Sequence, residues 1–413
     1  MSVRKTWKEL QEIMKQMNVS RIWSWSKWNC FKNSWYEYYL KYIAKVDEDR
    51  ANSIYVTTGG LAHNILEDFY EGKISYEQMA DDFEDGWVTA FDIADLKFDR
   101  NNSEHNDKIA GKYYEDLKHF FMNHKPVKYK ILLEQFVKSM IGNNLFQGYI
   151  DACFKDEEGN VHIVDFKTSS IYKGKKAEDE AGQLIIYAIG LHQQGIPFEK
   201  IFICWNFLKY VSVQYEQANG AIKTREIERA EIGEKLQANA KTWLKKLGYT
   251  DQIDDYLKLL LDTNSIECLP KNVQEKYVIS DCYVYVPITD VLIERWVNDI
   301  VTTIKDIELR EEDYQTMKEK GISEAECSKV FWDSDEKVKE KSYYFATLCA
   351  YSPSLHLPYK AYLDRLEEQK NGQDTFNGLG GGNNVLVTSK SIKQTTNNTN
   401  NDDEVDLSWL DNL

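Results

Sequence analysis

The sequence predicts an α/β protein built on a mixed β-sheet with helices on its faces. A hairpin pattern covers residues 146–167, where two alternating strands flank the turn Asp-Glu-Glu-Gly-Asn. Strand patterns precede it at residues 128–137 and follow it at 200–206, 210–215 and 277–286. Helical patterns lie between and beyond them, among them one from about 226 to 246 and one from 289 to about 309. A strand, a hairpin, a helix and further strands in this order typically form such a sheet.

Length and composition are those of a globular protein. The chain has 413 residues, of which 42% are hydrophobic, so it can bury one large core or two modest ones. No run of about 18 apolar residues occurs, and charges interrupt residues 1–20. The sequence therefore predicts neither a membrane span nor a signal peptide, and we expect a cytoplasmic protein.

The net charge of −16 disfavours a nucleic-acid partner only at first sight. Residues 21–45 carry five basic side chains against Glu37 alone, and residues 167–176 carry four lysines and no acid. Local patches of this kind steer a charged substrate more than the total charge does.

The first 45 residues combine an amphipathic helix with an aromatic, basic segment. Trp7, Leu10 and Met14 recur at helical spacing within residues 5–17. From Trp23 to Tyr42, tryptophans and tyrosines alternate with cations such as Lys27, as in channels that bind single-stranded nucleic acid. A buried aromatic helix explains the same pattern, and we favour it for most of these rings.

The region before the hairpin predicts helices and one strand. His63 and Glu67 lie one turn apart in a predicted helix after Gly59-Gly60, where a histidine is more often a paired surface residue than a ligand. Residues 77–108 read as an acidic helical insertion and residues 112–124 as a helix. The strand at 128–137 carries Glu134, either as an acid behind the site or as a salt-bridge partner.

The hairpin brings three charged side chains together. Asp165 and Lys167 share one face of the second strand because strand side chains alternate. Asp151, near the end of the first strand, can lie beside Asp165, and two adjacent carboxylates raise each other's pKa unless a cation lies between them. A divalent metal is the natural cation, although a surface hairpin with a salt bridge would give the same residues.

The context of the hairpin favours the metal site. A basic loop follows it, and then a predicted helix carries Gln183 and Tyr187 one turn apart. The loop lysines are Lys173, Lys175 and Lys176. In this order the sequence resembles the RecB-like branch of the PD-(D/E)xK nucleases, whose pattern is a helical His, Gly-x-x-Asp, Asp-x-Lys and Gln-x-x-x-Tyr. The matching residues are His63, Asp151, Asp165, Lys167, Gln183 and Tyr187.

The resemblance implies a restriction-endonuclease-like core and metal-dependent hydrolysis of DNA to 5′-phosphate and 3′-hydroxyl ends, with an exonuclease acting on single strands or DNA ends as the expected activity. Asp151, Asp165, the carbonyl of Phe166 and His63 would hold Mg²⁺ or Mn²⁺, and the histidine nitrogen slightly favours Mn²⁺. Lys167 would orient the attacking water or neutralise developing charge, and Glu134 is a further candidate catalytic acid. The expected substrate-binding residues are Gln183, Tyr187, Lys173, Lys175, Lys176 and Lys27.

Some RecB relatives also hold an iron–sulfur cluster through one N-terminal cysteine and a tight C-terminal trio. Here seven cysteines are scattered along the chain, and Cys327 and Cys349 stand far apart in the sequence without a trio. We therefore expect no cluster and reduced thiols.

The C-terminal segment predicts a docking function. Residues 371–413 are rich in Gly, Asn and Thr and predict a flexible tether, whose acidic tip carries Leu407, Trp409 and Leu410. The tip resembles the acidic C-terminal peptide of single-strand DNA-binding proteins and, more faintly, peptides that dock on sliding clamps. No Walker motif is present, so a helicase would have to be a separate chain.

The predicted organisation has four segments. Residues 1–126 form a helical region with the motif histidine, 127–217 the nuclease core, 218–370 a mostly helical part of the same domain, and 371–413 the tether. The alternative function is an inactive nuclease fold that serves as a DNA-binding or scaffold subunit and docks on single-strand binding protein or a clamp. A recombination accessory with secondary cleavage is the other alternative.

Overall fold

The computed structural model describes residues 4–48, 54–94, 103–351 and 356–376, which form two compact units. The first unit takes the chain up to Trp25 and then Ala51–Thr303, and the second takes Ser26–Arg50 and the residues from Ile304 onward. Two crossings between the units fall inside helices, α2 (Trp25–Asn33) and α12 (Asp290–Glu319).

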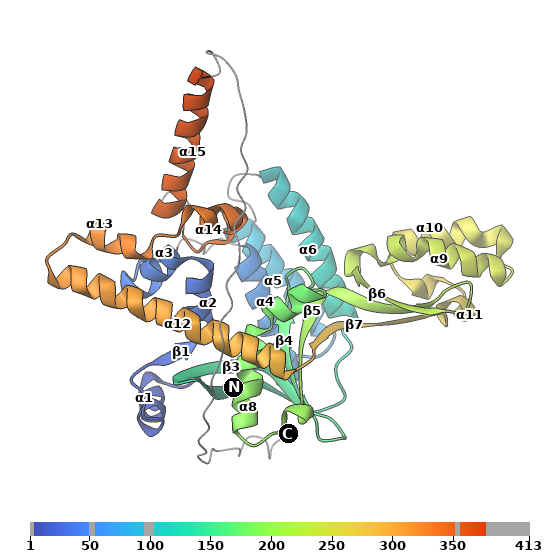
Figure 1. Ribbon diagram of the computed structural model, residues 1–413. Coiled ribbons are helices and arrows are strands. Elements are labelled where there is room, and N and C mark those ends of the chain that lie inside the picture. The colour runs from blue at the N-terminus through green and yellow to red at the C-terminus, as the bar shows by residue number, and fades with distance from the viewer. Residues whose placement is uncertain (1–3, 49–53, 95–102, 352–355, 377–413) are drawn as a thin grey trace. The chain divides into compact units, whose positions relative to one another are not determined.

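Seven strands form one mixed sheet in the first unit (Figure 1). They are β1 (Ile22–Ser24), β2 (Ile131–Ile141), β3 (Asn144–Lys155), β4 (Val161–Lys167), β5 (Ile201–Glu216), β6 (Ile222–Glu228) and β7 (Tyr277–Val286). The long strands β3 and β5 organise the sheet. This architecture, a mixed sheet with many helices, agrees with the predicted restriction-endonuclease-like α/β fold.

One edge of β3 is shared by two strands. The antiparallel strand β2 pairs with β3 along nearly its whole length, so β1 and β4 must use the opposite edge. There β1 pairs in parallel with residues 145–147 and β4 pairs antiparallel with residues 152–155. In the sheet as described, residues 148–151 therefore lie between the ends of two neighbouring strands.

The turn between β3 and β4 explains why the hairpin forms locally. Oδ1 of Asp156 accepts the backbone N–H groups of Glu158 and Asn160, both at 2.9 Å. Gly159 has a φ of 77°, a left-handed conformation that glycine adopts without a steric penalty. The predicted hairpin is confirmed.

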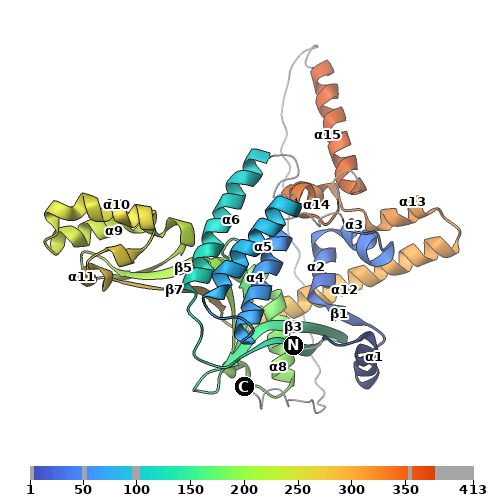
Figure 2. The same cartoon turned by 180° about the vertical axis from the view of Figure 1, so that it is seen from behind.

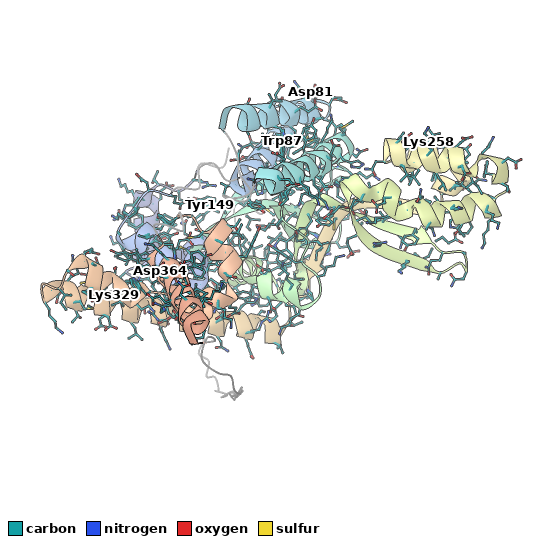
Figure 3. The ribbon with its side chains drawn as sticks, turned by 90° about the horizontal axis from the view of Figure 1, so that it is seen from above. Asp81, Trp87, Tyr149, Lys258, Lys329 and Asp364 are labelled. Carbon is teal, nitrogen blue, oxygen red and sulfur yellow. The ribbon has the colours of Figure 1, made fainter. Side chains whose placement is uncertain are left out.

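Three helices cover part of the sheet: α4 (Ile54–Tyr70), α5 (Gln78–Ala94) and α6 (Ser103–Asn123), which lie side by side in Figures 1 and 2. Their buried residues form one cluster with side chains of β3, β4 and β5, including Leu66, Phe83, Phe120, Phe154, Phe166 and Leu208. On α5, Trp87 is buried in this cluster whereas Asp81 is exposed (Figure 3).

The helix α8 (Gly182–Gln193) packs against β2 and follows the short helix α7 (Lys175–Glu180). Ser139 of β2 donates its hydroxyl to the carbonyl of Ile186 at 2.6 Å. Gly190 permits this approach, because an added Cβ would lie 2.4 Å from the Ser139 hydroxyl. The helix α1 (Trp7–Gln16) precedes β1 in the chain and lies close to the helix predicted at residues 5–17.

A second cluster lies beyond the core sheet. β5 extends past its pairing with β4 and there pairs with β6 and β7, and this extension packs on α9 (Ile232–Lys246), α10 (Ile253–Thr263) and α11 (Lys271–Gln274). Two predictions are corrected here. The strands expected at 200–206 and 210–215 are one strand with a register shift between Asn206 and Val211, and the helix expected from 226 begins at Ile232 because β6 occupies residues 222–228.

The second unit is helical. Besides the latter part of α12 it contains α3 (Trp35–Tyr38), α13 (Glu324–Cys327), α14 (Asp335–Glu340) and α15 (Leu357–Phe376). Ser34 caps α3 and donates its hydroxyl to the buried carboxylate of Asp333 at 2.7 Å. The carboxylate in turn accepts the Trp35 N–H at 2.8 Å, so buried polar groups join the two sequence segments of this unit.

The predicted tether begins within α15, which ends at Phe376, and the rest of it lies outside the described residues. Among the helices described, none is long and apolar enough to cross a membrane. The cytoplasmic location stays a prediction.

Candidate active site

The β3–β4 hairpin brings two aspartates together. Ala152 of β3 pairs antiparallel with Val164 of β4, so the next residues, Asp151 and Asp165, lie on the same side of this pair on adjacent strands. The backbone N–H of Phe166 donates to Oδ2 of Asp151 at 3.2 Å and holds that carboxylate against β4.

The carboxylate of Asp165 is almost fully buried beside a lysine. Its Oδ2 lies 2.6 Å from Nζ of Lys167, and the Asp165 side chain is only 5% exposed. No partner other than this ammonium is found for Oδ2 among the described residues. Phe166 alternates with these two residues and packs in the cluster under α4, so Asp165 and Lys167 point to the opposite face.

The charges of this group are unbalanced. Burial, and then the charge of Asp165, raise the pKa of Asp151 above its usual value, although His63 and Lys167 oppose the shift. Burial lowers the pKa of Lys167, but the two carboxylates outweigh burial and raise it overall. Two carboxylates and one ammonium leave an excess negative charge that a further cation would neutralise.

His63 reaches the group from α4. Its Nε2 lies 3.0 Å from the carbonyl oxygen of Phe166, and its Nδ1 lies 3.7 Å from Oδ2 of Asp151. Because a carbonyl only accepts hydrogen bonds, Nε2 carries the proton in this arrangement. In the neutral ring the lone pair of Nδ1 then faces the Asp151 carboxylate.

Gln183 and Tyr187 form the wall on the α8 side. Nε2 of Gln183 donates to the Tyr187 hydroxyl at 2.9 Å, as their one-turn spacing allows. The Tyr187 ring presses on Gly148, where an added Cβ would lie 2.4 Å from Cε1. This contact therefore requires the glycine of the Gly-x-x-Asp motif. Burial also raises the pKa of Tyr187.

Glu134 lies close to Asp151 but is paired elsewhere. Leu133 pairs with Ala152 and Gln135 with Ile150, which puts Glu134 opposite Asp151 in the register. Its φ of 49° is left-handed, and its carboxylate lies 3.3 Å from the guanidinium of Arg4. Of the two roles considered for Glu134, this geometry is that of a salt-bridge partner.

The basic residues predicted to bind substrate are spread over several environments. Lys173 is paired with Glu226 at 2.7 Å, and Nζ of Lys176 lies over the ring of Tyr172 at 5.2 Å from its centre. Lys175 is exposed at the start of α7. Lys27 belongs to the second unit, where its Nζ lies 5.5 Å from the ring centre of Tyr42.

These residues fall within a region that matches a known family. The model of the PD-(D/E)XK nuclease superfamily matches residues 22–267, well over half of the 413 residues. The chain belongs to the PD-(D/E)XK nuclease superfamily. The match runs from β1 past α10 and includes His63, Asp151, Asp165, Lys167, Gln183 and Tyr187. No curated protein matches the chain.

Membership in the superfamily implies a nuclease that acts on DNA, typically with divalent ions such as Mg²⁺ or Mn²⁺, and the residues present fit such an ion. Among the described residues, no three or more His, Cys, Asp or Glu side chains are arranged to hold a metal ion by themselves. Asp151, Asp165 and the Phe166 carbonyl supply oxygen ligands, and the buried Oδ2 of Asp165 contacts only the Lys167 ammonium among the described residues. Mg²⁺ sites commonly use one or two carboxylates and leave the remaining positions to water and phosphate, so these oxygens suffice.

Some residues near the site were not identified from the sequence. Arg4 is 130 positions from its partner Glu134, and no local pattern connects them. Tyr172 packs edge-on against Trp205 and Phe207, both with ring centres at 5.1 Å, and thereby orders the loop after Lys167. Tyr172 could have been identified from the sequence as a residue near the site, because it lies among the lysines of the basic loop.

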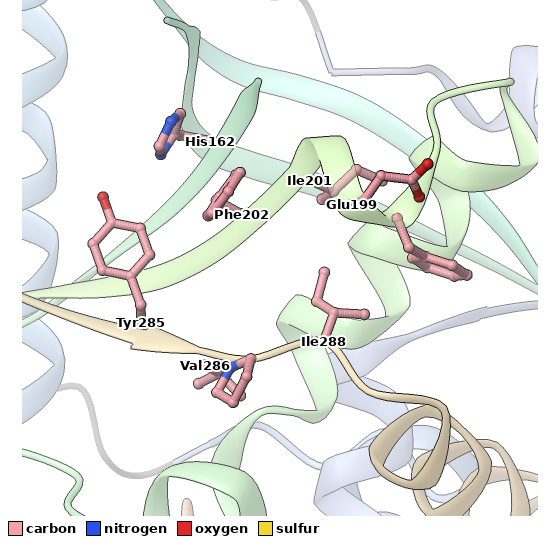
Figure 4. A pocket seen from close by; sticks show the side chains of 9 residues that line it. His162, Glu199, Ile201, Phe202, Tyr285, Val286 and Ile288 are labelled. Atoms are coloured by element: carbon pink, nitrogen blue, oxygen red, sulfur yellow. The ribbon is translucent and has the colours of Figure 1, made fainter. Parts of the chain in front are cut away.

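A pocket of about 580 Å³ lies away from the predicted catalytic residues, none of which line it (Figure 4). Its wall includes His162, Phe202 and Tyr285. The ring of His162 is stacked between Phe154 at 4.6 Å and Phe202 at 5.1 Å, and its Nε2 bonds to Asp156 at 2.9 Å. This histidine is engaged in packing and in the hairpin turn rather than in chemistry.

Proposed function

We propose that this chain is a metal-dependent DNA exonuclease of the RecB-like branch that acts on single strands or DNA ends in replication, repair or recombination. The convergence of Asp151, Asp165 and Lys167 beside His63 supports the assignment most strongly. Three sequence segments supply these residues, as the RecB-like pattern requires. The Gln183–Tyr187 pair against Gly148 completes the pattern.

In this proposal Asp151, Asp165 and the Phe166 carbonyl would hold the ion, and His63 would add a nitrogen ligand once its ring no longer bonds to that carbonyl. A bound Mg²⁺ or Mn²⁺ lowers the pKa of coordinated water and stabilises charge on the transferring phosphoryl group. The Phe166 N–H fixes the Asp151 carboxylate in place, which would limit the reorganisation needed to bind the ion.

Lys167 acts as a cation rather than as a base. Although burial lowers its pKa, the neighbouring carboxylates raise the pKa overall and favour the ammonium, which can only donate hydrogen bonds. In this role Nζ orients the attacking water and neutralises negative charge on the phosphate. Burial of Asp165 beside it keeps the ammonium on the catalytic face of β4.

Substrate contacts are assigned to the α7–α8 side of the site. Gln183 and Tyr187 hold the DNA backbone or the loop after Lys167, and the exposed Lys175 and Lys176 approach phosphates. Glu134 is assigned to its ion pair with Arg4. The core of the activity then lies in residues 127–217, together with the His63 helix.

The segment 371–413 is assigned to recruitment. Trp409 and its aliphatic neighbours among acids offer an apolar anchor of the kind that dominates peptide docking. Single-strand DNA-binding protein or a sliding clamp is the proposed partner, and a separate helicase would supply any unwinding. Retention of either protein on a 402–413 peptide, with turnover on naked oligonucleotides unchanged after deletion of 377–413, is the expected result.

The proposed activity is tested with end-labelled linear and circular single-stranded DNA in Mn²⁺ or Mg²⁺. An exonuclease degrades the linear strand, leaves the circle intact and releases 5′-phosphate products. Cleavage of the circle would replace the exonuclease assignment with an endonuclease. Stability of every DNA substrate in both metals would overturn the proposed function.

A further inference from the structure

The structure separates the aromatic residues between Trp23 and Tyr42 into buried and partly exposed rings. The buried ones are Trp23, Trp28, Phe31, Tyr36, Tyr38 and Tyr39. Their role is packing, as favoured from the sequence. Trp25 differs from them, because it is partly exposed and belongs to the first unit, which carries the candidate active site.

The strand β1 brings Trp25 to the catalytic part of β3. Ser24, the last residue of β1, pairs in parallel with Gln147, and Trp25 follows it directly as the first residue of α2. At about 3.3 Å per residue, Asp151 lies about 13 Å beyond Gln147 along β3. Residues 148–151 are the stretch between the ends of β1 and β4, so one bound strand can engage Trp25 and the carboxylates together.

The ring of Trp25 is also fixed against the helix of the Gln-x-x-x-Tyr motif. An added Cβ on Gly182 would lie 2.5 Å from two atoms of the Trp25 ring, so only glycine fits beside it. Trp296 packs against the same ring at 5.8 Å between centres and is itself anchored by its Nε1, which donates to the Glu178 carbonyl at 3.0 Å. The Trp25 ring is therefore held in place before substrate binds.

The neighbours of Trp25 link it to the site. Gln183 follows Gly182 directly and bonds to Tyr187, whose ring presses on Gly148. The exposed Lys175 and Lys176 precede the same helix on α7. An aromatic face beside cations is the combination with which proteins bind single-stranded nucleic acid, by stacking bases and attracting phosphates.

We infer that Trp25 stacks on a base of the substrate strand next to the catalytic group and thereby makes the nuclease selective for unpaired, base-containing DNA. This inference rests on the proposed nuclease function. Base faces are available to a protein ring only where the bases are unstacked from a duplex, which selects single strands or frayed ends. Because every base has an aromatic face, the contact gives little sequence preference.

The test measures binding in an Asp165→Asn background, so that the DNA is not consumed. A single-stranded oligonucleotide is compared with the same oligonucleotide carrying abasic sites. With Trp25 present, the intact strand should bind about 5- to 150-fold more tightly, the range expected for one stacked base. With Trp25→Leu, which keeps apolar packing but removes the aromatic face, the ratio should fall towards one, and Trp25→Phe should retain most of it.

Trp7→Leu is the matched control, because Trp7 is 61% exposed on α1 and should leave the ratio unchanged. An unchanged ratio in a folded Trp25→Leu protein would overturn the inference. If that variant does not fold, photocrosslinking of an oligonucleotide that contains 5-iodouracil to a protein with Trp25 intact decides the question. Attachment to the peptide with Trp25 supports the inference, and attachment only elsewhere overturns it.

The role of Trp25 and the nuclease function can be refuted separately. DNA cleavage by the wild-type protein together with an unchanged ratio refutes the role of Trp25 alone. Absence of both cleavage and DNA binding in the wild-type protein refutes the nuclease function, and with it the role of Trp25.

Discussion

Replacing Asp151 with Asn should make the metal-free nuclease more stable while it abolishes cleavage. Asp151 lies beside the buried Asp165, and burial together with that second charge raises its pKa. The ionised carboxylate therefore opposes folding. Asn removes the charge, and its amide oxygen can still accept the Phe166 N–H that now bonds to the carboxylate at 3.2 Å.

The size of the effect follows from linkage. Each unit by which the native pKa exceeds the unfolded value costs about 1.4 kcal/mol of folding free energy at high pH. Because burial beside Asp165 raises the pKa of Asp151 to about 7, the ionised carboxylate would cost a few kcal/mol at high pH, or several °C in melting temperature. Between the unfolded pKa near 4 and the raised native pKa, the native state binds more protons, so this cost grows with pH.

The assay is thermal unfolding in EDTA near pH 4.5 and near pH 8. The gain in melting temperature from Asp151→Asn should be small at the lower pH and largest at the higher one, and added Mn²⁺ should stabilise only the wild type. Asp156→Asn is the matched control, and its expected effect on stability has the opposite sign. The hydrogen bond from His162 lowers the pKa of Asp156, so losing this carboxylate should destabilise the protein at pH 8.

One result would refute the reasoning about charge. An Asp151→Asn protein that melts at or below the wild-type temperature in EDTA at pH 8 would show that the two carboxylates do not repel each other in the folded protein.

Three further predictions concern neighbouring parts of the nuclease unit. His63→Ala should shift the Mn²⁺ dependence of the cleavage rate to higher concentration, and an unchanged titration would leave His63 with a structural role only. Gly148→Ala should cost about 1–3 kcal/mol of unfolding free energy and slow cleavage, since its Cβ would lie 2.4 Å from Tyr187; equal stability in urea would contradict this. Asp281→Asn should cost about 3–5 kcal/mol at neutral pH by leaving the buried Arg229, now 2.5 Å from the carboxylate, without its partner. Burial alone would raise the pKa of Asp281, but hydrogen bonding and the Arg229 charge lower it overall. The stability that Asp281→Asn loses, measured by unfolding in urea, should therefore vanish only below that lowered pKa.

The hairpin and its charged residues could be predicted because they depend on local patterns. Alternation places Asp165 and Lys167 on one face, and the turn chemistry around Asp156 and Gly159 fixes the register that brings in Asp151. The Gln183–Tyr187 pair likewise depends only on helical spacing.

Other features depend on contacts that no local pattern records. β6 begins with exposed residues such as Lys223 and Arg225 and lacks the alternation of a half-buried strand. β5 contains the buried Lys209, whose Nζ lies 3.6 Å from the ring centre of Tyr113 on α6, so a strand that is continuous in three dimensions looks interrupted in the sequence. Trp25 contacts Gly182, which lies 157 positions away in the chain. Because no local pattern records this contact, the sequence could not distinguish Trp25 from the buried aromatic residues around it.

The most direct measurement is the cleavage rate of end-labelled linear single-stranded DNA in Mn²⁺ by the wild type, Asp165→Ala and Asp156→Ala proteins. Asp165 belongs to the catalytic group, whereas Asp156 lies in the hairpin turn. We predict that Asp165→Ala lowers the rate by about 100-fold or more, beyond the loss typical of residues that only support a metal ligand. Asp156→Ala should retain activity at a temperature where it is folded, and full activity of a folded Asp165→Ala protein would contradict a nuclease site built on Asp165.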